Sequence, residues 1–153
     1  MSLRFTRTLP LLVAGLLSMA GLHATEAQHV RASGAWIRVL PGDLPAGAYV
    51  TLENTGDQAA SLRSAHSASY ASAMLHQSSS EGGVSRMSMV DDLAIPAHGK
   101  VELSPGGYHL MLMKATSPVK IGDKIKVTLT FGDGSTLDTD FVARPANASS
   151  LSD

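Results

Sequence analysis

The sequence contains no cysteine among its 153 residues. Disulfide bonds are therefore excluded, and the stability of the fold must come from packing. Without a thiolate the chain cannot perform thiol–disulfide exchange. It also cannot form a blue-copper electron-transfer site, which needs a cysteine sulfur beside two histidines. Any soft metal site in this chain must use histidine and methionine.

An excess of charge of one sign is also missing. The chain carries 12 basic and 13 acidic residues, which gives a formal net charge of −1. No stripe of basic residues is available to follow a phosphate backbone or an anionic membrane surface. We therefore expect no nucleic acid among its partners.

Only one long hydrophobic run is present, and it lies near the N-terminus. Residues 9–22, LPLLVAGLLSMAGL, follow two arginines and precede the small-residue segment HATEA. This order is typical of a secretory signal peptide, and the run is too short and too interrupted for a convincing membrane span. We predict a signal peptide over residues 1–27, cut after Ala27 or alternatively after Ala24. After this cut we expect no membrane insertion.

Sustained helical periodicity is absent from the rest of the chain. Short segments that alternate apolar and polar residues are instead separated by glycine and proline. The clearest is KIKVTLTF (124–131), whose four apolar residues share one face of a strand. This pattern predicts an all-β antiparallel Greek-key barrel or sandwich over residues 28–144, followed by a polar flexible tail over residues 145–153. The other expected strands are 35–40, 48–54, 61–67, 71–77, 84–90, 100–104, 108–113 and 136–143, with a serine- and glycine-rich loop at 78–83.

No constellation typical of an enzyme is visible. The sequence shows no serine–histidine–aspartate order and no glycine-rich phosphate loop. Asp91 and Asp92 form an acidic pair, but neighbouring residues of a strand or turn point apart. We therefore predict that the protein is not an enzyme.

Methionine is distributed unevenly. Two of the seven methionines belong to the predicted signal peptide, and the other five lie between residues 74 and 113. Alternate residues of a strand project from the same face, about 6.5–7 Å apart, so both members of such a pair can reach one ion. Three expected strands each carry a pair of this kind: Met74/His76, Met87/Met89 and His109/Met111.

Histidine and methionine side chains together favour copper in its +1 state. Thioethers are soft, neutral ligands, and imidazole also suits copper. A set of two imidazoles and two thioethers carries no negative charge, which favours the monovalent ion. Methionine is also common as flexible core filling, and this alternative stays open for the set. We interpret Met74 and Met113 as packing residues.

The spacing of four of these residues resembles that of a known family. His76 is followed by ten residues and Met87, and twenty-one further residues precede His109, with Met111 two positions on. This spacing is similar to that of the periplasmic copper chaperones called PCu(A)C. The segments GAWIRVLPGDLPAGAYVTLENTG and IPAHGKVELSPGGYHLMLM resemble the family as well, so that the similarity covers essentially the whole mature chain.

The resemblance implies a cupredoxin-like β-barrel that binds one Cu(I) per chain through His76, Met87, His109 and Met111. It implies a periplasmic monomer that delivers copper to the copper centre of cytochrome c oxidase subunit II, alongside Sco-type proteins. Many members carry an acidic residue directly after the first histidine, where this chain has Gln77. The tail has no histidine or methionine for a second copper site.

Two other functions remain compatible with the sequence. A periplasmic copper buffer or resistance protein would need the same site as a chaperone. A metal-free structural β-sandwich would use the methionines only for packing.

Overall fold

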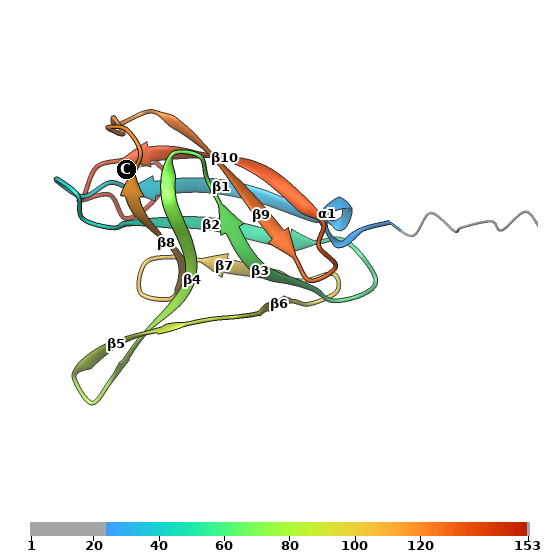
Figure 1. Cartoon of the computed structure of the whole chain (residues 1–153). Helices are drawn as coiled ribbons and strands as arrows, with labels where there is room; N and C mark the ends of the chain where they lie inside the picture. The colour runs from blue at the N-terminus through green and yellow to red at the C-terminus, as the bar shows by residue number, and fades with distance from the viewer. Residues whose placement is uncertain (1–23, 153) are drawn as a thin grey trace, which may run out of the picture.

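Residues 24–152 are described by the structure, a computed structural model, and they form almost only strands (Figure 1). The elements are α1 (Glu26–His29), β1 (Val30–Arg38), β2 (Ala46–Asn54), β3 (Ala60–His66), β4 (Tyr70–Glu81), β5 (Val84–Met89), β6 (Leu93–Ile95), β7 (Lys100–Leu103), β8 (Tyr108–Ala115), β9 (Lys124–Phe131) and β10 (Thr136–Arg144). No helix within this part of the chain is long and apolar enough to cross a membrane.

The strands form one curled sheet that does not close. Their order is β5-β4-β8-β2-β1-β10-β9-β3-β6, and β7 pairs with β2. Curling brings β3 beside β4 although these strands share no ladder, so the sheet folds over as a sandwich. The predicted all-β class is confirmed. One described pair, β1 with β10, is parallel; such a pair needs a long connection, and the rest of the domain supplies it.

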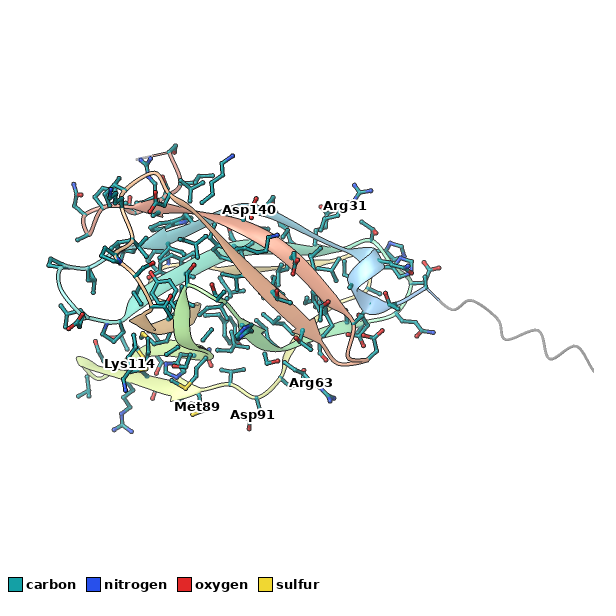
Figure 2. All side chains as sticks on the ribbon, turned by 45° about the horizontal axis from the view of Figure 1, so that its top comes forward. Arg31, Arg63, Met89, Asp91, Lys114 and Asp140 are labelled. Carbon is teal, nitrogen blue, oxygen red and sulfur yellow. The ribbon has the colours of Figure 1, made fainter. Side chains whose placement is uncertain are left out.

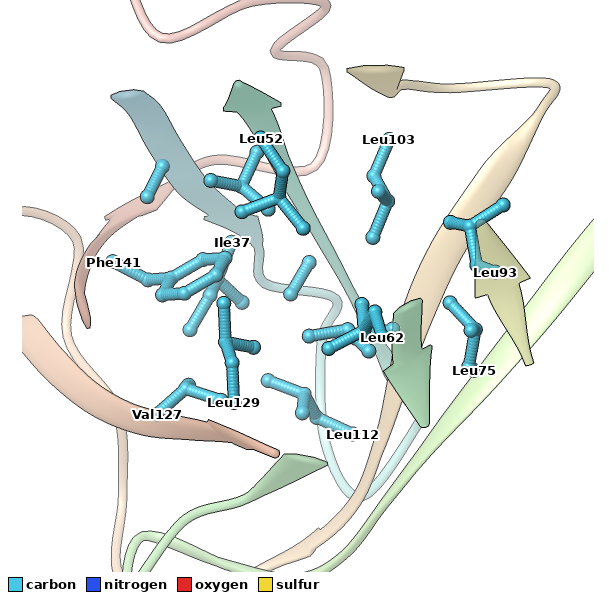
Figure 3. Close-up of a cluster of buried hydrophobic side chains, with 14 of the residues drawn as sticks. Ile37, Leu52, Leu62, Leu75, Leu93, Leu103, Leu112, Val127, Leu129 and Phe141 are labelled. Carbon is cyan, nitrogen blue, oxygen red and sulfur yellow. The ribbon is translucent and has the colours of Figure 1, made fainter. Parts of the chain in front are cut away.

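The apolar faces of the folded sheet meet in a single large core (Figure 3). The alternation predicted for residues 124–131 is confirmed, because Ile125, Val127, Leu129 and Phe131 are all buried. Burying a side chain of this size contributes about 1.5–3 kcal/mol. The core therefore determines which face of each strand points inward.

The hairpin between β4 and β5 differs from the prediction. We expected a loop over residues 78–83, but β4 continues to Glu81, and only Gly82 and Gly83 form the turn. Both glycines have positive φ, 57° and 76°, which suits a two-residue hairpin turn of type I′. This hairpin projects from the body of the molecule (Figure 1). The expected loop was wrong because the serines of β4 lie beyond the core and show no apolar alternation. The short strand β6 was also not predicted.

Part of the C-terminal segment, which we expected to be flexible, packs onto the sheet. Ala148 is only 2% exposed. Its carbonyl oxygen accepts two hydrogen bonds from the Arg38 guanidinium, of 3.0 and 2.7 Å. The prediction of a flexible tail from residue 145 is therefore wrong for residues 145–148.

Glu26 fastens the N-terminal segment to two distant strands. Its carboxylate accepts hydrogen bonds from the backbone N–H groups of Ser61 (3.0 Å) and Gly132 (3.1 Å). Its own N–H donates to the Asp133 carboxylate at 2.9 Å. The predicted signal peptide lies outside the described residues up to residue 23, but its end falls on this anchored segment.

We expect the chain that begins at Thr25, after a cut behind Ala24, to be more stable than the chain that begins at Gln28, after a cut behind Ala27. Only the longer chain keeps the hydrogen bonds of Glu26, and hydrogen bonds to a charged group contribute about 1.5–3 kcal/mol each. Chemical denaturation of the two chains checks this. Equal free energies of unfolding would contradict the expectation.

Candidate metal centre

Three neighbouring strands present histidine and methionine on one outward face. β4 lies between β5 and β8. Leu75 of β4 is opposite Leu110 of β8, and both are buried in the core. Because side chains alternate along a strand, the next residues, His76 and His109, point to the other face. These two histidines are themselves directly opposite each other.

Methionines lie in the rows on either side of this histidine pair, and Met89 is opposite His76 in the same row. Met74 is opposite Met111 in the row further from the hairpin turn. Met87 is opposite Ser78 in the row nearer the turn. We call this surface the His–Met face; its members are Met74, His76, Met87, Met89, His109, Met111 and Met113.

The two imidazoles lie close together, and only one of their four ring nitrogens has a hydrogen-bond partner in the described residues. Their ring centroids are 5.8 Å apart, with an angle of 84° between the planes. Nδ1 of His109 lies 3.1 Å from the Gly107 carbonyl oxygen. Because a carbonyl oxygen only accepts, Nδ1 carries the proton, and Nε2 presents its lone pair.

Nε2 of His109 and both ring nitrogens of His76 are buried without a hydrogen-bond partner in the described residues. Buried polar atoms without a partner are rare and costly. A cation bound between the rings would take Nε2 of His109 and one of the two ring nitrogens of His76. The residues present therefore fit a metal ion.

Burial lowers the pKa of the His76 imidazole below its usual value, and the nearby His109 lowers it further. The neutral form of histidine is the form that binds a metal. At neutral pH the His76 imidazole is therefore in the neutral form that can bind a metal.

The methionines differ in their exposure to solvent. Met111 is half-buried, whereas 53% of Met87 and 66% of Met89 is exposed. Figure 2 shows Met89 on the side of the molecule where the β4–β5 hairpin lies. Met74 and Met113 are half-buried on the His–Met face. Neither belongs to the core, so any packing role of these two methionines lies on the outer face of the sheet.

The chemistry of the face comes from neutral donors. Within residues 24–152, no three histidine, aspartate or glutamate side chains gather in a metal-binding arrangement. The available set is two imidazoles and several thioethers, which favours Cu(I) over a divalent ion. Of the predicted ligands, His76, His109 and Met111 occupy adjacent positions, and Met87 lies one row from His76.

Gln77, which replaces the acidic residue of many PCu(A)C proteins, does not support His76. It follows His76 directly in β4, and so its side chain projects from the opposite face. It is exposed.

An aromatic cluster beside His109 was missed by the sequence analysis. The Tyr49 ring lies 6.5 Å from the His109 ring and 4.6 Å from the Trp36 ring. The Arg38 guanidinium carbon lies 5.6 Å from both aromatic centroids, within the range of a cation–π contact. No local pattern could have revealed this cluster, because it forms where β8 pairs with β2 and β2 pairs with β1, strands that lie far from β8 in the sequence.

The fold and the His–Met face together define a cupredoxin-like β-sandwich of the PCuAC type. The copper-bound PCuAC domain from PmoF2 has a TM-score of 0.66 and 22% identity, covering 81% of this chain and 99% of that domain. The solution structure of Cu(I)-bound DR1885 from Deinococcus radiodurans has a TM-score of 0.63 and 34% identity, covering 85% of each chain. The predicted resemblance to PCu(A)C proteins is thus confirmed for the fold.

A family model also matches most of the chain. Residues 30–143 match the family described as "Putative lipoprotein LpqE-like". The relative "Putative lipoprotein Lxx21020" from Leifsonia xyli subsp. xyli is 37% identical over 112 residues, which cover 72% of this chain and 67% of the relative. The chain belongs to the LpqE-like family.

Gly47 leaves space for the Tyr49 ring, which lies beside His109. It is opposite Met111 in the β2–β8 ladder. A Cβ at position 47 would lie 2.5 Å from the Tyr49 hydroxyl oxygen and 3.0 Å from ring carbon Cζ. We expect Gly47→Ala to displace the ring, to shift the His109 ring resonances in NMR spectra, and to lower the free energy of unfolding by about 1–3 kcal/mol.

The double variant Gly47→Ala/Tyr49→Phe is the matched control. It lacks the hydroxyl that makes the closest approach, and part of the lost stability should return. Unchanged His109 resonances and unfolding in Gly47→Ala would show that the ring is not held in this way.

Proposed function

We propose that this protein is an exported carrier that binds one Cu(I) through His76, Met87, His109 and Met111. The observation that carries the proposal is the opposed histidine pair on a face rich in methionine, in which both ring nitrogens of His76 and Nε2 of His109 are buried without a partner in the described residues. Cu(I) is here the cargo of the protein. The donor set is soft, neutral and free of cysteine, which would oxidise to disulfides outside the cytoplasm.

The comparisons support copper as the cargo. DR1885, at 34% identity, is described as bound to Cu(I). The PmoF2 domain of the same fold is described as copper-bound. The name of the Leifsonia relative describes a lipoprotein, which is consistent with export to the periplasm.

The ligands differ in how firmly the protein holds them. His109 is buried, and its hydrogen bond to Gly107 fixes the orientation of the ring. Met87 is half-exposed on a projecting hairpin. In the proposed transfer, a partner's thiolate sulfurs displace the thioethers first and the imidazoles last. No electron moves, and Cu(I) leaves in the oxidation state in which it arrived.

The partners we propose are Sco-type proteins and the copper centre of cytochrome c oxidase subunit II. The same site would also serve a copper buffer. Oxidase activity under copper limitation separates the two roles, because loss of a delivery protein lowers this activity and loss of a buffer does not.

Substitution of the ligands tests the site. Under anaerobic conditions and against a competing chelator, we expect one equivalent of Cu(I) to bind. His76→Ala and Met111→Leu should each weaken binding by about 100-fold or more, equivalent to at least about 2.7 kcal/mol. The matched controls are His66→Ala and Met113→Leu, which remove a histidine and a methionine outside the proposed set. Wild-type affinity in both ligand variants would overturn the site.

The affinity should also depend on pH. Protons compete with copper for the imidazole nitrogens, whose ordinary pKa is about 6.5. The lowered pKa of His76 keeps this ligand neutral to a lower pH. We expect the Cu(I) affinity to be nearly constant above about pH 7 and to fall as the pH drops from about 6.5 to 5. An affinity that stays flat down to pH 5 would refute ligation by histidine.

A further inference from the structure

The β4–β5 hairpin brings a second methionine closer to the histidine pair than Met87. The two-residue turn places Glu81 opposite Val84. Five residues further along each strand, Met89 is opposite His76. Met89, His76 and His109 therefore form one row across three strands.

The hydrogen-bond pattern indicates how close Met89 and His76 are. The N–H of Val90 donates to the Leu75 carbonyl oxygen at 2.9 Å, so Leu75 and Val90 form a hydrogen-bonded pair. The next pair, His76 and Met89, is then of the non-hydrogen-bonded kind. In such pairs the Cα atoms are about 4.5 Å apart and the side chains approach most closely.

Met87 lies further from the histidines in this register. Its partner is Ser78, two residues nearer the turn, which is about 7 Å along the sheet. Met111 lies on the other side of the histidine row. Met89 is thus nearer than Met87 to the other predicted ligands.

Packing leaves the Met89 side chain free to bind. With 66% of its surface exposed, it is not committed to the core. Methionine is unbranched and flexible, and its thioether is a soft donor for Cu(I).

We propose that Met89 is a copper-binding residue that shares one coordination position with Met87, so that the two thioethers of β5 exchange on the bound ion. This inference rests on the proposed function. In each exchange one sulfur lone pair replaces another, the copper stays in the +1 state, and no proton moves because a thioether carries none. The exposed pair offers a partner's thiolate a coordination position that is already labile.

The test combines NMR and affinity measurements on the mature protein. With ¹³C-methyl-labelled methionine and one equivalent of Cu(I) under anaerobic conditions, the methyl signals of both Met87 and Met89 should shift. The Met113 methyl, one row beyond Met111, should not. Met87→Leu and Met89→Leu should each weaken binding by about 3- to 10-fold, and the double variant by more than the product of the two, about 100-fold or more.

An unshifted Met89 methyl, with a double variant no weaker than Met87→Leu alone, would overturn the inference. In that outcome the proposed function survives if His76→Ala still loses Cu(I). If the wild-type protein binds no Cu(I), both proposals fail. Both methionines are exposed, so the leucine variants should fold, and unchanged backbone amide spectra of β4 and β5 would verify this.

Discussion

The pairing of Leu75 with Leu110 holds β4 and β8 in the register on which the candidate metal centre depends. Both side chains lie in the core, and the hydrophobic effect therefore resists any slip between the strands. A slip of one residue would exchange the two faces of a strand. His76 or His109 would then enter the core, and the ring nitrogens would lose their common site. Packing of the leucines in the core thus determines which side chains form the His–Met face.

The side chains of the His–Met face also become more exposed from β8 to β5. On β8, His109 is buried and its ring is oriented by the Gly107 carbonyl. On β5, every residue is exposed and the strand ends the sheet. A carrier has to retain its ion and also release it. In the proposed carrier, the buried histidine side of the face would retain the ion, and the exposed thioether side would be accessible for its transfer.

Much of the fold and of the candidate site could be predicted from the sequence. The features that could not be predicted were missed for physical reasons. The alternation in residues 124–131 predicted the buried face of that strand, because the strand packs on the core. The serines of β4 gave no such signal, so the hairpin was mistaken for a loop. That error concealed the pairing of Met89 with His76, although the two glycines are typical of a tight turn. Tyr49 and Trp36 lie beside His109 because β2 and β1 follow β8 in the sheet, and no local pattern encodes a pairing between strands so far apart in the sequence.

The central claim is that two imidazoles and thioether sulfur bind one copper ion in its +1 state. X-ray absorption spectroscopy of the one-to-one Cu(I) complex tests it most directly, because it distinguishes nitrogen from sulfur neighbours. The account predicts mixed nitrogen and sulfur scattering, with the outer-shell pattern of two histidine rings. A spectrum with sulfur neighbours alone, or with no sulfur, would contradict it.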